Sequence, residues 1–474
     1  MLAVAIALLC NMFALQNVSF ADENGYSSQL QEDLDLENAA YSKMARFLSA
    51  VGEAYVSEDR ARVEVTDPNG NTQEVTGFFN ALGMCNKKSG YTVKLMENIN
   101  TGKEFTVNND TNITIDLNGH IINCEQHKLF HFDKHATVKL TSSAVSGGSV
   151  VKGSITNAYN SGWGGAIETW GTTTIENIKF ESCRSSSSTK KDYGGAILTR
   201  GDFEGDEHDP VIVLNLKNCD FINCYAGDRG GAICMWHLCT GNLLSDESSN
   251  DWMVGHAELY MEGCTFDNCR AADQDGGAFY LRNSEVEAKN CTVTNCHAGR
   301  DGGFADLYDG SDLTLRNCTI TGCTAGCRGS AVDVDYGYEI DDTANSDKQW
   351  LASCVTIYDT TITGCTASDI EQSGGAVHIW TGRDHPGEIQ LGGSTRIIDN
   401  YDNDGNQSNV CLGSSKEDNK VRIQLTDRHP FTEDTLIGIG CSEKTDWETI
   451  ASTYLYDQHE YTLREFTENA LQHF

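Results

Sequence analysis

Three aspartates, Asp306, Asp333 and Asp335, have the type and spacing best suited to chemistry in this chain. Asp306 stands four residues after a Gly-Gly pair begins at Gly302, and Asp333 and Asp335 stand four and six residues after the corresponding Gly329. Stacked segments would crowd these carboxylates, and crowded carboxylates raise one another's pKa, which supplies one acid and one base for glycosidic cleavage. The same oxygens could instead hold Ca²⁺, so both uses stay open.

Aromatic rings and guanidinium groups occupy the same two positions in other copies of this motif. The set predicted to bind a ligand is Trp170, Arg200, Trp236, Tyr280, Arg282, Tyr308, His378 and Trp380. Such side chains suit stacking and hydrogen bonding to sugars or to partner proteins. The largest insertions, at about residues 201–210, 237–255 and 336–353, follow the same segments, and insertions repeated at one corner usually build a binding face. The alternative, that the rings only stack on one another, stays open.

A repeat must position these residues. Gly-Gly-Ala or a close variant begins at residues 164, 194, 230, 276, 302, 329 and 374, and the spacings of 26 and 27 after residue 276 define the unit. Before most copies stands a cysteine pair: NCDFINC (218–224), GCTFDNC (263–269), NCTVTNC (290–296) and NCTITGC (317–323). Apolar residues alternate with period two within each unit, which indicates strands. Several short strands with polar turns and no helical period predict one coil of a β-helix.

The sequence therefore predicts an all-β fold, a right-handed parallel β-helix (solenoid) of roughly ten rungs with an N-terminal α/β cap and a short C-terminal cap. Gly-Gly allows a tight corner, and alanine allows neighbouring backbones to approach. The predicted divisions are a signal peptide (1–21), an N-terminal cap region with a helix and a hairpin (22–90), the β-helix (91–400), and a C-terminal cap and tail (401–474).

The N-terminal residues predict export. Residues 2–15 form an apolar run too short to span a bilayer, and Ser19-Phe20-Ala21 is a small-x-small cleavage site. We therefore expect a secreted or cell-surface protein. The 69 acidic and 34 basic side chains give a net charge of −35, which repels phosphate backbones and anionic lipids. We expect no nucleic-acid partner, and no later segment is apolar enough to predict a transmembrane span.

The chain has nineteen cysteines, and nine of them are expected to form two columns in the stacked repeat, one of Cys224, Cys269, Cys296, Cys323 and Cys365 and the other of Cys219, Cys264, Cys291 and Cys318. Paired CxxC spacing is absent, which argues against zinc. Stacked α-carbons lie within disulfide range, but parallel Cβ vectors favour a buried ladder of free thiols that pack as small apolar groups. Disulfides between rungs stay open, above all for Cys234/Cys239 and Cys327/Cys354, which lie near insertions.

The paired motifs also resemble a known family. GGAI recurs at 164, 194 and 230, and the chain carries Phe180-x-x-Cys183, Phe221-x-x-Cys224 and Phe266-x-x-Cys269, with Cys where the family's FxxN element has Asn. Over about residues 90–440 the chain resembles adhesin-like right-handed β-helix proteins with polymorphic outer-membrane protein repeats.

The resemblance implies an adhesin-like protein that binds a glycan, or a surface protein of a host or neighbouring cell, without a cofactor. It is loose for function, since β-helices also serve as lyases, hydrolases and structural spikes. Two alternatives stay open. One is a polysaccharide lyase or glycoside hydrolase that uses Asp306, Asp333 and Asp335. The other is a purely structural surface component.

Overall fold

The computed structural model describes residues 55–187, 191–201, 212–237, 257–335, 338–340, 349–368, 374–380, 387–412, 423–425 and 429–441. All of these except Tyr55 belong to one compact unit, Val56–Phe474. The predicted signal peptide, residues 22–54 of the predicted N-terminal cap region and most of the predicted C-terminal cap and tail lie outside the described residues. The division of the chain into four regions stays a prediction.

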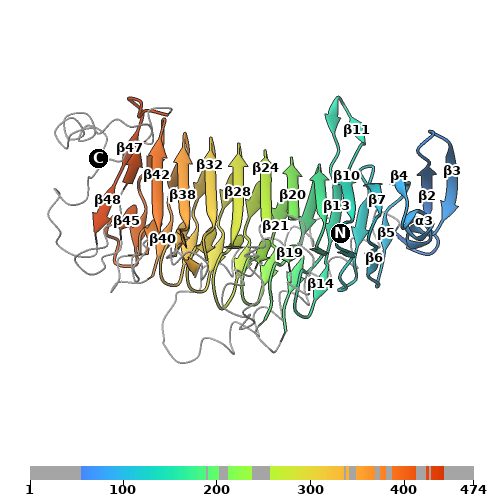
Figure 1. Cartoon of the computed structure of the whole chain (residues 1–474), viewed down its shortest axis with the longest axis horizontal. Coiled ribbons are helices and arrows are strands. Elements are labelled where there is room, and N and C mark those ends of the chain that lie inside the picture. Colours follow the sequence, from blue (N-terminus) through green and yellow to red (C-terminus); the bar gives the residue numbers. More distant parts are fainter. Residues whose placement is uncertain are drawn as a thin grey trace, which may run out of the picture. The chain divides into compact units, whose positions relative to one another are not determined.

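Four long sheets run along the stack (Figure 1). A 13-stranded sheet contains, in spatial order, β3 (Thr72–Thr76), β2 (Arg62–Thr66), β4 (Ser89–Leu95), β7 (Asn112–Asp116), β10 (Thr137–Thr141), β16 (Thr172–Glu176), β20 (Ile212–Lys217), β24 (Ala257–Glu262), β28 (Ser284–Lys289), β32 (Asp312–Arg316), β38 (Cys354–Tyr358), β42 (Glu388–Gly392) and β46 (Ile423–Leu425). A 12-stranded sheet contains β1 (Val56–Ser57), β5 (Ile99–Asn100), β8 (Ile121–Asn123), β13 (Gly153–Thr156), β17 (Ile178–Glu181), β21 (Asp220–Ile222), β25 (Thr265–Asp267), β29 (Thr292–Thr294), β33 (Thr319–Thr321), β39 (Thr361–Thr363), β43 (Arg396–Ile397) and β47 (Leu436–Ile437).

The other two long sheets follow in each coil. An eight-stranded sheet contains β14 (Tyr159–Asn160), β18 (Arg184–Ser185), β22 (Tyr225–Ala226), β26 (Arg270–Ala271), β30 (His297–Ala298), β34 (Thr324–Ala325), β40 (Thr366–Ala367) and β44 (Tyr401–Asp402). An 11-stranded sheet contains β48 (Ile439–Cys441), β45 (Val410–Leu412), β41 (Val377–Ile379), β35 (Val332–Val334), β31 (Ala305–Tyr308), β27 (Phe279–Arg282), β23 (Ile233–His237), β19 (Ile197–Gly201), β15 (Ile167–Thr169), β9 (Phe130–Phe132) and β6 (Phe105–Val107). Two hairpins project from the coils, β11 (Val145–Ser146) with β12 (Ser149–Val150), and β36 (Tyr338–Ile340) with β37 (Gln349–Leu351).

One coil uses one strand from each sheet, as β24, β25, β26 and β27 do before β28 begins the next coil. Corresponding residues pair in parallel and in register from coil to coil, which confirms the stacked coils that the repeat predicted. Leu259, Val286 and Leu313 follow one another in register, and all three are buried in the core. Rings also stack inside, since the Phe221 centroid lies 4.9 Å from that of Phe180 and 4.8 Å from that of Phe266. The apolar core therefore runs inside the coils.

The Gly-Gly corners require glycine for two different reasons. The first glycine of the pair adopts the left-handed region in every Gly-Gly pair from Gly164 to Gly302, as Gly276 does with φ +72°, which disfavours any residue with a Cβ. The second lies against the next coil, because a Cβ on Gly277 would stand 2.0 Å from the Gly303 carbonyl oxygen. The corner that the motif predicted is thus confirmed, and it sets where the following strand begins.

Helix α3 (Phe78–Cys85) and an antiparallel ribbon precede the coils. β2 pairs antiparallel with β3 around residues 67–71 and with β4 on its other side. Phe78 and Leu82 of α3 are buried in the same core as the coils. Unpaired strand edges invite association, and an apolar helix face on the first coils protects the core there.

None of the sixteen cysteines whose state the structure gives forms a disulfide, and all of them except Cys327 and Cys354 are buried. The ladder cysteines donate weakly to backbone, as Cys269 Sγ does to the Phe221 carbonyl oxygen at 3.4 Å. At the corresponding position of a later coil, Asn400 Nδ2 donates to the carbonyl oxygens of Ile362 (3.1 Å) and Ile398 (3.0 Å). Cysteine and asparagine thus satisfy the same carbonyl groups, which accounts physically for Cys at the FxxN position.

Candidate functional site

The outer face of the 11-stranded sheet carries the predicted site residues in two columns. Its strands alternate, so that Ile233 and Met235 face the core while Cys234 and Trp236 face outward. The first outward column consists of Glu168, Leu198, Cys234, Tyr280, Asp306, Asp333, His378 and Cys411. The second outward column consists of Trp170, Arg200, Trp236, Arg282, Tyr308, Asp335 and Trp380.

A third column stands directly before the glycine pairs. This pre-glycine column consists of Trp163, Tyr193, Arg229, Asp275, Asp301 and Arg328, and each successive pair of coils is joined there by a backbone hydrogen bond from the following glycine. Its Tyr193 packs with Leu198, Cys234 and Tyr280 in a small apolar cluster outside the main core. The pre-glycine column therefore lies over part of the first outward column.

The burial of each predicted site residue determines whether a partner can reach it. Tyr280 is 3% exposed and His378 is 1% exposed, so these two do not form part of an open surface. Trp170, Arg200, Trp236, Arg282, Tyr308 and Trp380 are all half-buried. The side chains of the first outward column therefore point away from the core, as the sequence predicted, but other residues cover them.

Rings and guanidinium groups alternate along the second outward column. Arg200, Trp236, Arg282 and Tyr308 are partners in consecutive coils. The Arg282 guanidinium lies 4.9 Å from the Trp236 ring centroid and 5.8 Å from that of Tyr308, and its Nε bonds Asp309 Oδ2 at 2.7 Å. Tyr193 stacks on Trp236 at 4.6 Å. Because neighbours cover the faces of the Trp236 ring, it offers mainly its edge to a partner.

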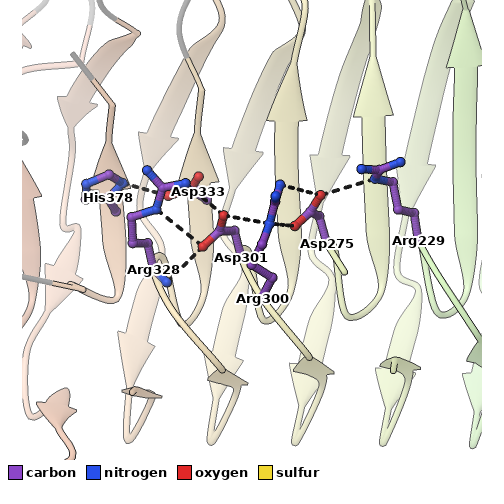
Figure 2. A network of polar contacts seen from close by, with 7 residues as sticks. All are labelled: Arg229, Asp275, Arg300, Asp301, Arg328, Asp333 and His378. Carbon is purple, nitrogen blue, oxygen red and sulfur yellow. Dashed lines mark hydrogen bonds and ion pairs between the residues drawn. The ribbon is translucent and has the colours of Figure 1, made fainter. Parts of the chain in front are cut away.

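Acidic and basic groups alternate in the neighbouring coils (Figure 2). Asp275 accepts from Arg229 Nε at 3.1 Å and from Arg300 Nε and Nη2 at 2.7 and 2.9 Å. Asp301 accepts from Arg328 Nη2 at 2.8 Å and from the Arg328 backbone at 3.0 Å. Charge-assisted bonds of this kind are short and directional, so they fix the corner that adjoins the second column.

The three predicted catalytic aspartates meet as the repeat indicated. Asp306 pairs in register with Asp333, and all three carboxylates are buried. Burial, and then the charges of Asp275 and Asp333, raise the pKa of Asp306 well above its usual value. Burial, and then the Asp333 charge, raise the pKa of Asp335 to about 8. The cluster can therefore hold protons near neutral pH.

A metal role for these aspartates has no geometric support. Within the described ranges, no group of three or more His, Cys, Asp or Glu side chains is placed to hold a metal ion. Asp333 Oδ1 is bonded to His378 Nδ1 at 2.7 Å, which takes one of the oxygens that calcium would need. The calcium site stays a prediction.

The comparisons with known proteins concern the same coils. A family model described as "Right handed beta helix region" matches residues 165–299 and 245–395. The fold is a right-handed parallel β-helix. The matched part of the β-helix holds the glycine corners and most of the three columns. No curated protein matches the chain. In the part of the chain that is described, no helix is long and apolar enough to cross a membrane.

A β-helix fits both adhesin-like proteins and polysaccharide-degrading enzymes, so the fold alone does not choose a function. Sequence reasoning missed the pre-glycine column, although its position directly before each Gly-Gly pair was a usable signal. It also missed Cys411, since no Gly-Gly pair precedes this residue in the sequence. Cys411 enters the first outward column only through the pairing of β45 with β41.

Proposed function

We propose that the protein is an exported, adhesin-like β-helix that does not degrade polysaccharides and that binds a partner through its second outward column. The observation that carries this proposal is the in-register alternation of Arg200, Trp236, Arg282 and Tyr308, all half-buried and already held by their neighbours. Trp, Tyr and Arg dominate binding hot spots. Side chains ordered before binding lose little further conformational entropy when a partner arrives.

The ring arrangement favours a surface protein of a host or neighbouring cell over a glycan as the partner. Sugars bind aromatic residues best through the open ring face, and Trp236 has Tyr193 and Arg282 against its ring. Arg328 lies 4.2 Å from the Trp380 ring centroid, so this ring too has a cation on one face. Ring edges and guanidinium groups instead suit carbonyl and carboxylate groups of a protein.

A double variant tests the binding face. Trp236→Ala with Trp380→Ala should weaken attachment to cells by a few kcal/mol in total, as for aromatic anchors at a protein interface. The matched control is Tyr260→Ala, which removes an exposed ring from the outer face of β24 in the 13-stranded sheet.

The readout is titration of the labelled protein onto intact cells, protease-treated cells and a glycan array. Protease sensitivity supports a protein partner, whereas retained binding on the array identifies a glycan. If the folded double variant attaches as the wild type does, or if Tyr260→Ala weakens attachment equally, the second column is not the binding face.

Export is the second part of the proposal, supported by the apolar run at residues 2–15 and the small residues around Ala21. Expression with a secretion system and N-terminal sequencing of the released protein should give a chain that begins at residue 22. Retention of the uncleaved chain inside the cell would contradict it.

The raised pKa of Asp335 favours a second candidate function, the cleavage of polysaccharides. A carboxylic acid that stays protonated near neutral pH can protonate a glycosidic oxygen while a neighbouring carboxylate acts as base. Depolymerisation assays on pectin, alginate and neutral glycans, with and without Ca²⁺, compare the wild type with Asp335→Asn and Asp306→Asn. Turnover that both variants abolish would replace the binding proposal, and no turnover on any substrate removes this candidate.

A further inference from the structure

We propose that Asp333, His378 and Cys411 form a nucleophilic site of the cysteine–histidine–aspartate type, which takes the acyl group of a small ester. The three residues lie on the consecutive strands β35, β41 and β45 of the 11-stranded sheet. Asp333 pairs in register with His378, and His378 pairs in register with Cys411. The flanking residues of each strand are in the core, so all three side chains leave the coil on the same side.

The histidine is oriented by the aspartate. Asp333 Oδ1 lies 2.7 Å from His378 Nδ1, and both side chains are almost completely buried (Figure 2). A carboxylate accepts, so Nδ1 carries the hydrogen and Nε2 of the neutral ring keeps its lone pair. Asp333 Oδ2 is buried and has no hydrogen-bond partner among the described residues.

The cysteine stands on the other side of the histidine. Neighbouring strands lie about 4.8 Å apart, so His378 is between Asp333 and Cys411 in the order that nucleophilic triads require, with orienting acid, base and nucleophile in sequence. Another thiol of the same column, Cys234, has Leu198 and Tyr280 as its strand neighbours. Burial raises the pKa of the Cys234 thiol strongly, so this thiol is an inert reference within the same molecule.

The expected reaction is acyl transfer to Cys411 and then to water. His378 Nε2 takes the thiol proton, and the thiolate attacks the acyl carbon, so that a C–S bond forms and the ester C–O bond breaks. The leaving alkoxide receives the proton from His378. Water then loses a proton to His378 and attacks the thioester, a C–O bond forms, the C–S bond breaks, and the proton returns to the sulfur.

Burial sets the size of the substrate. Cys411 is 2% exposed and His378 is 1% exposed, so a polymer cannot reach the sulfur, and a small ester reaches it only when the covering side chains move aside. The half-buried Trp380 ring, 6.0 Å from that of His378, provides an apolar neighbour for a short acyl chain. This site shares the Trp380 ring with the proposed partner-binding face, but the two proposals are tested separately, because the chemistry of this site is measured on the free protein with no partner present.

The full chain is tested with p-nitrophenyl acetate and, separately, with iodoacetamide. Peptide mass spectrometry locates the acetyl or carbamidomethyl group, and alkylation rates are measured between pH 5 and 9. Cys411 should be acetylated with release of p-nitrophenol, and it should be alkylated at least tenfold faster at pH 7 than Cys234. His378→Gln should reduce the Cys411 rate by at least tenfold at pH 7 and move its pH profile upward. Asp333→Asn should move the profile in the same direction by a smaller amount.

Matched variants keep the test decisive. Cys411→Ser should abolish the adduct, and Cys234→Ser should leave acetylation of Cys411 unchanged. Thermal melting identifies any variant that has lost the fold, and the comparison of Cys411 with Cys234 in the wild type does not depend on a variant. The proposal is overturned if the two thiols react equally, or if folded His378→Gln keeps the wild-type rate and pH profile.

Discussion

Asp275 and Arg300, on neighbouring coils, form a bidentate ion pair in which Nε and Nη2 donate to the two carboxylate oxygens at 2.7 and 2.9 Å. The same carboxylate also accepts from Arg229 of the preceding coil. The buried Asp275 carboxylate therefore binds one arginine of the preceding coil and one of the following coil. Three coils are tied together at the corner beside the candidate binding face.

The first prediction concerns this junction. Asp275→Asn leaves Arg229 and Arg300 without their shared counter-charge and should lower the free energy of unfolding by about 3–5 kcal/mol. The control is Glu262→Gln, which breaks the exposed pair with Lys217 and should cost no more than about 1 kcal/mol. Urea denaturation measures both. Equal losses in the two variants would show that the junction contributes little.

The second prediction concerns pH. An unfolded aspartate titrates near pH 4, whereas Asp335 in the folded protein titrates at about 8, so the folded state binds more protons between these values. Stability contributed by the protonated side chain is complete below about pH 4 and is lost as the pH rises through about 8, by up to about 1.4 kcal/mol per pH unit. Asp335→Asn cannot ionise, so its stability should fall less between pH 5 and 9.

Urea titrations of both proteins at several pH values supply the measurement. The variant should be the more stable protein at pH 9, where the buried Asp335 of the wild type is ionised beside Asp333. Parallel pH profiles for the two proteins would mean that Asp335 titrates normally. Glu168, whose pKa is lowered to about 2 against burial mainly by hydrogen bonding to His131 and the charge of Lys128, affects stability only at lower pH.

The third prediction concerns the glycine corner. Gly277→Ala places a Cβ 2.0 Å from the Gly303 carbonyl oxygen and must push two coils apart, which should cost about 3 kcal/mol or more. Gly83→Ala in α3 meets nothing within 4 Å and should be neutral or stabilising by up to about 1 kcal/mol. Thermal unfolding compares the two. A Gly277→Ala protein as stable as the wild type would refute the close approach of the coils.

The fourth prediction concerns the thiols. Alkylation in denaturant without reductant should label all sixteen cysteines that the structure shows outside disulfides. In the native protein, apart from Cys411, the half-buried Cys327 should be labelled first, because burial raises the pKa of the Cys354 thiol to about 12. Intact mass and peptide mapping measure the labels. A mass increase that appears only after reduction would reveal disulfides between coils, which the parallel Cβ vectors of stacked residues disfavour.

The sequence was sufficient to predict the strands and the core of each coil, but it was insufficient to predict how side chains pack on the outer surface. Period-two alternation and Gly-Gly spacing predicted that Ile233 faces the core and that Asp306 stands beside Asp333, because a regular repeat places equivalent residues on neighbouring strands. The burial of Tyr280 was not predictable in this way, since it depends on how the pre-glycine residues pack over the strand. The pairing of Asp275 with two arginines likewise depends on side-chain reach, which the repeat does not specify.

The pairing of β32 with β38 has a consequence for how such a chain can change over generations. Asp312 pairs with Cys354, 42 residues along the chain, whereas Glu285 pairs with Asp312 at a distance of 27, and both pairs are in register. Fifteen additional residues between coils therefore leave the ladder intact. Insertion and deletion at this corner can alter the outer surface of the coils while the core is inherited unchanged, so the surface and the folding of the chain can evolve under separate selection.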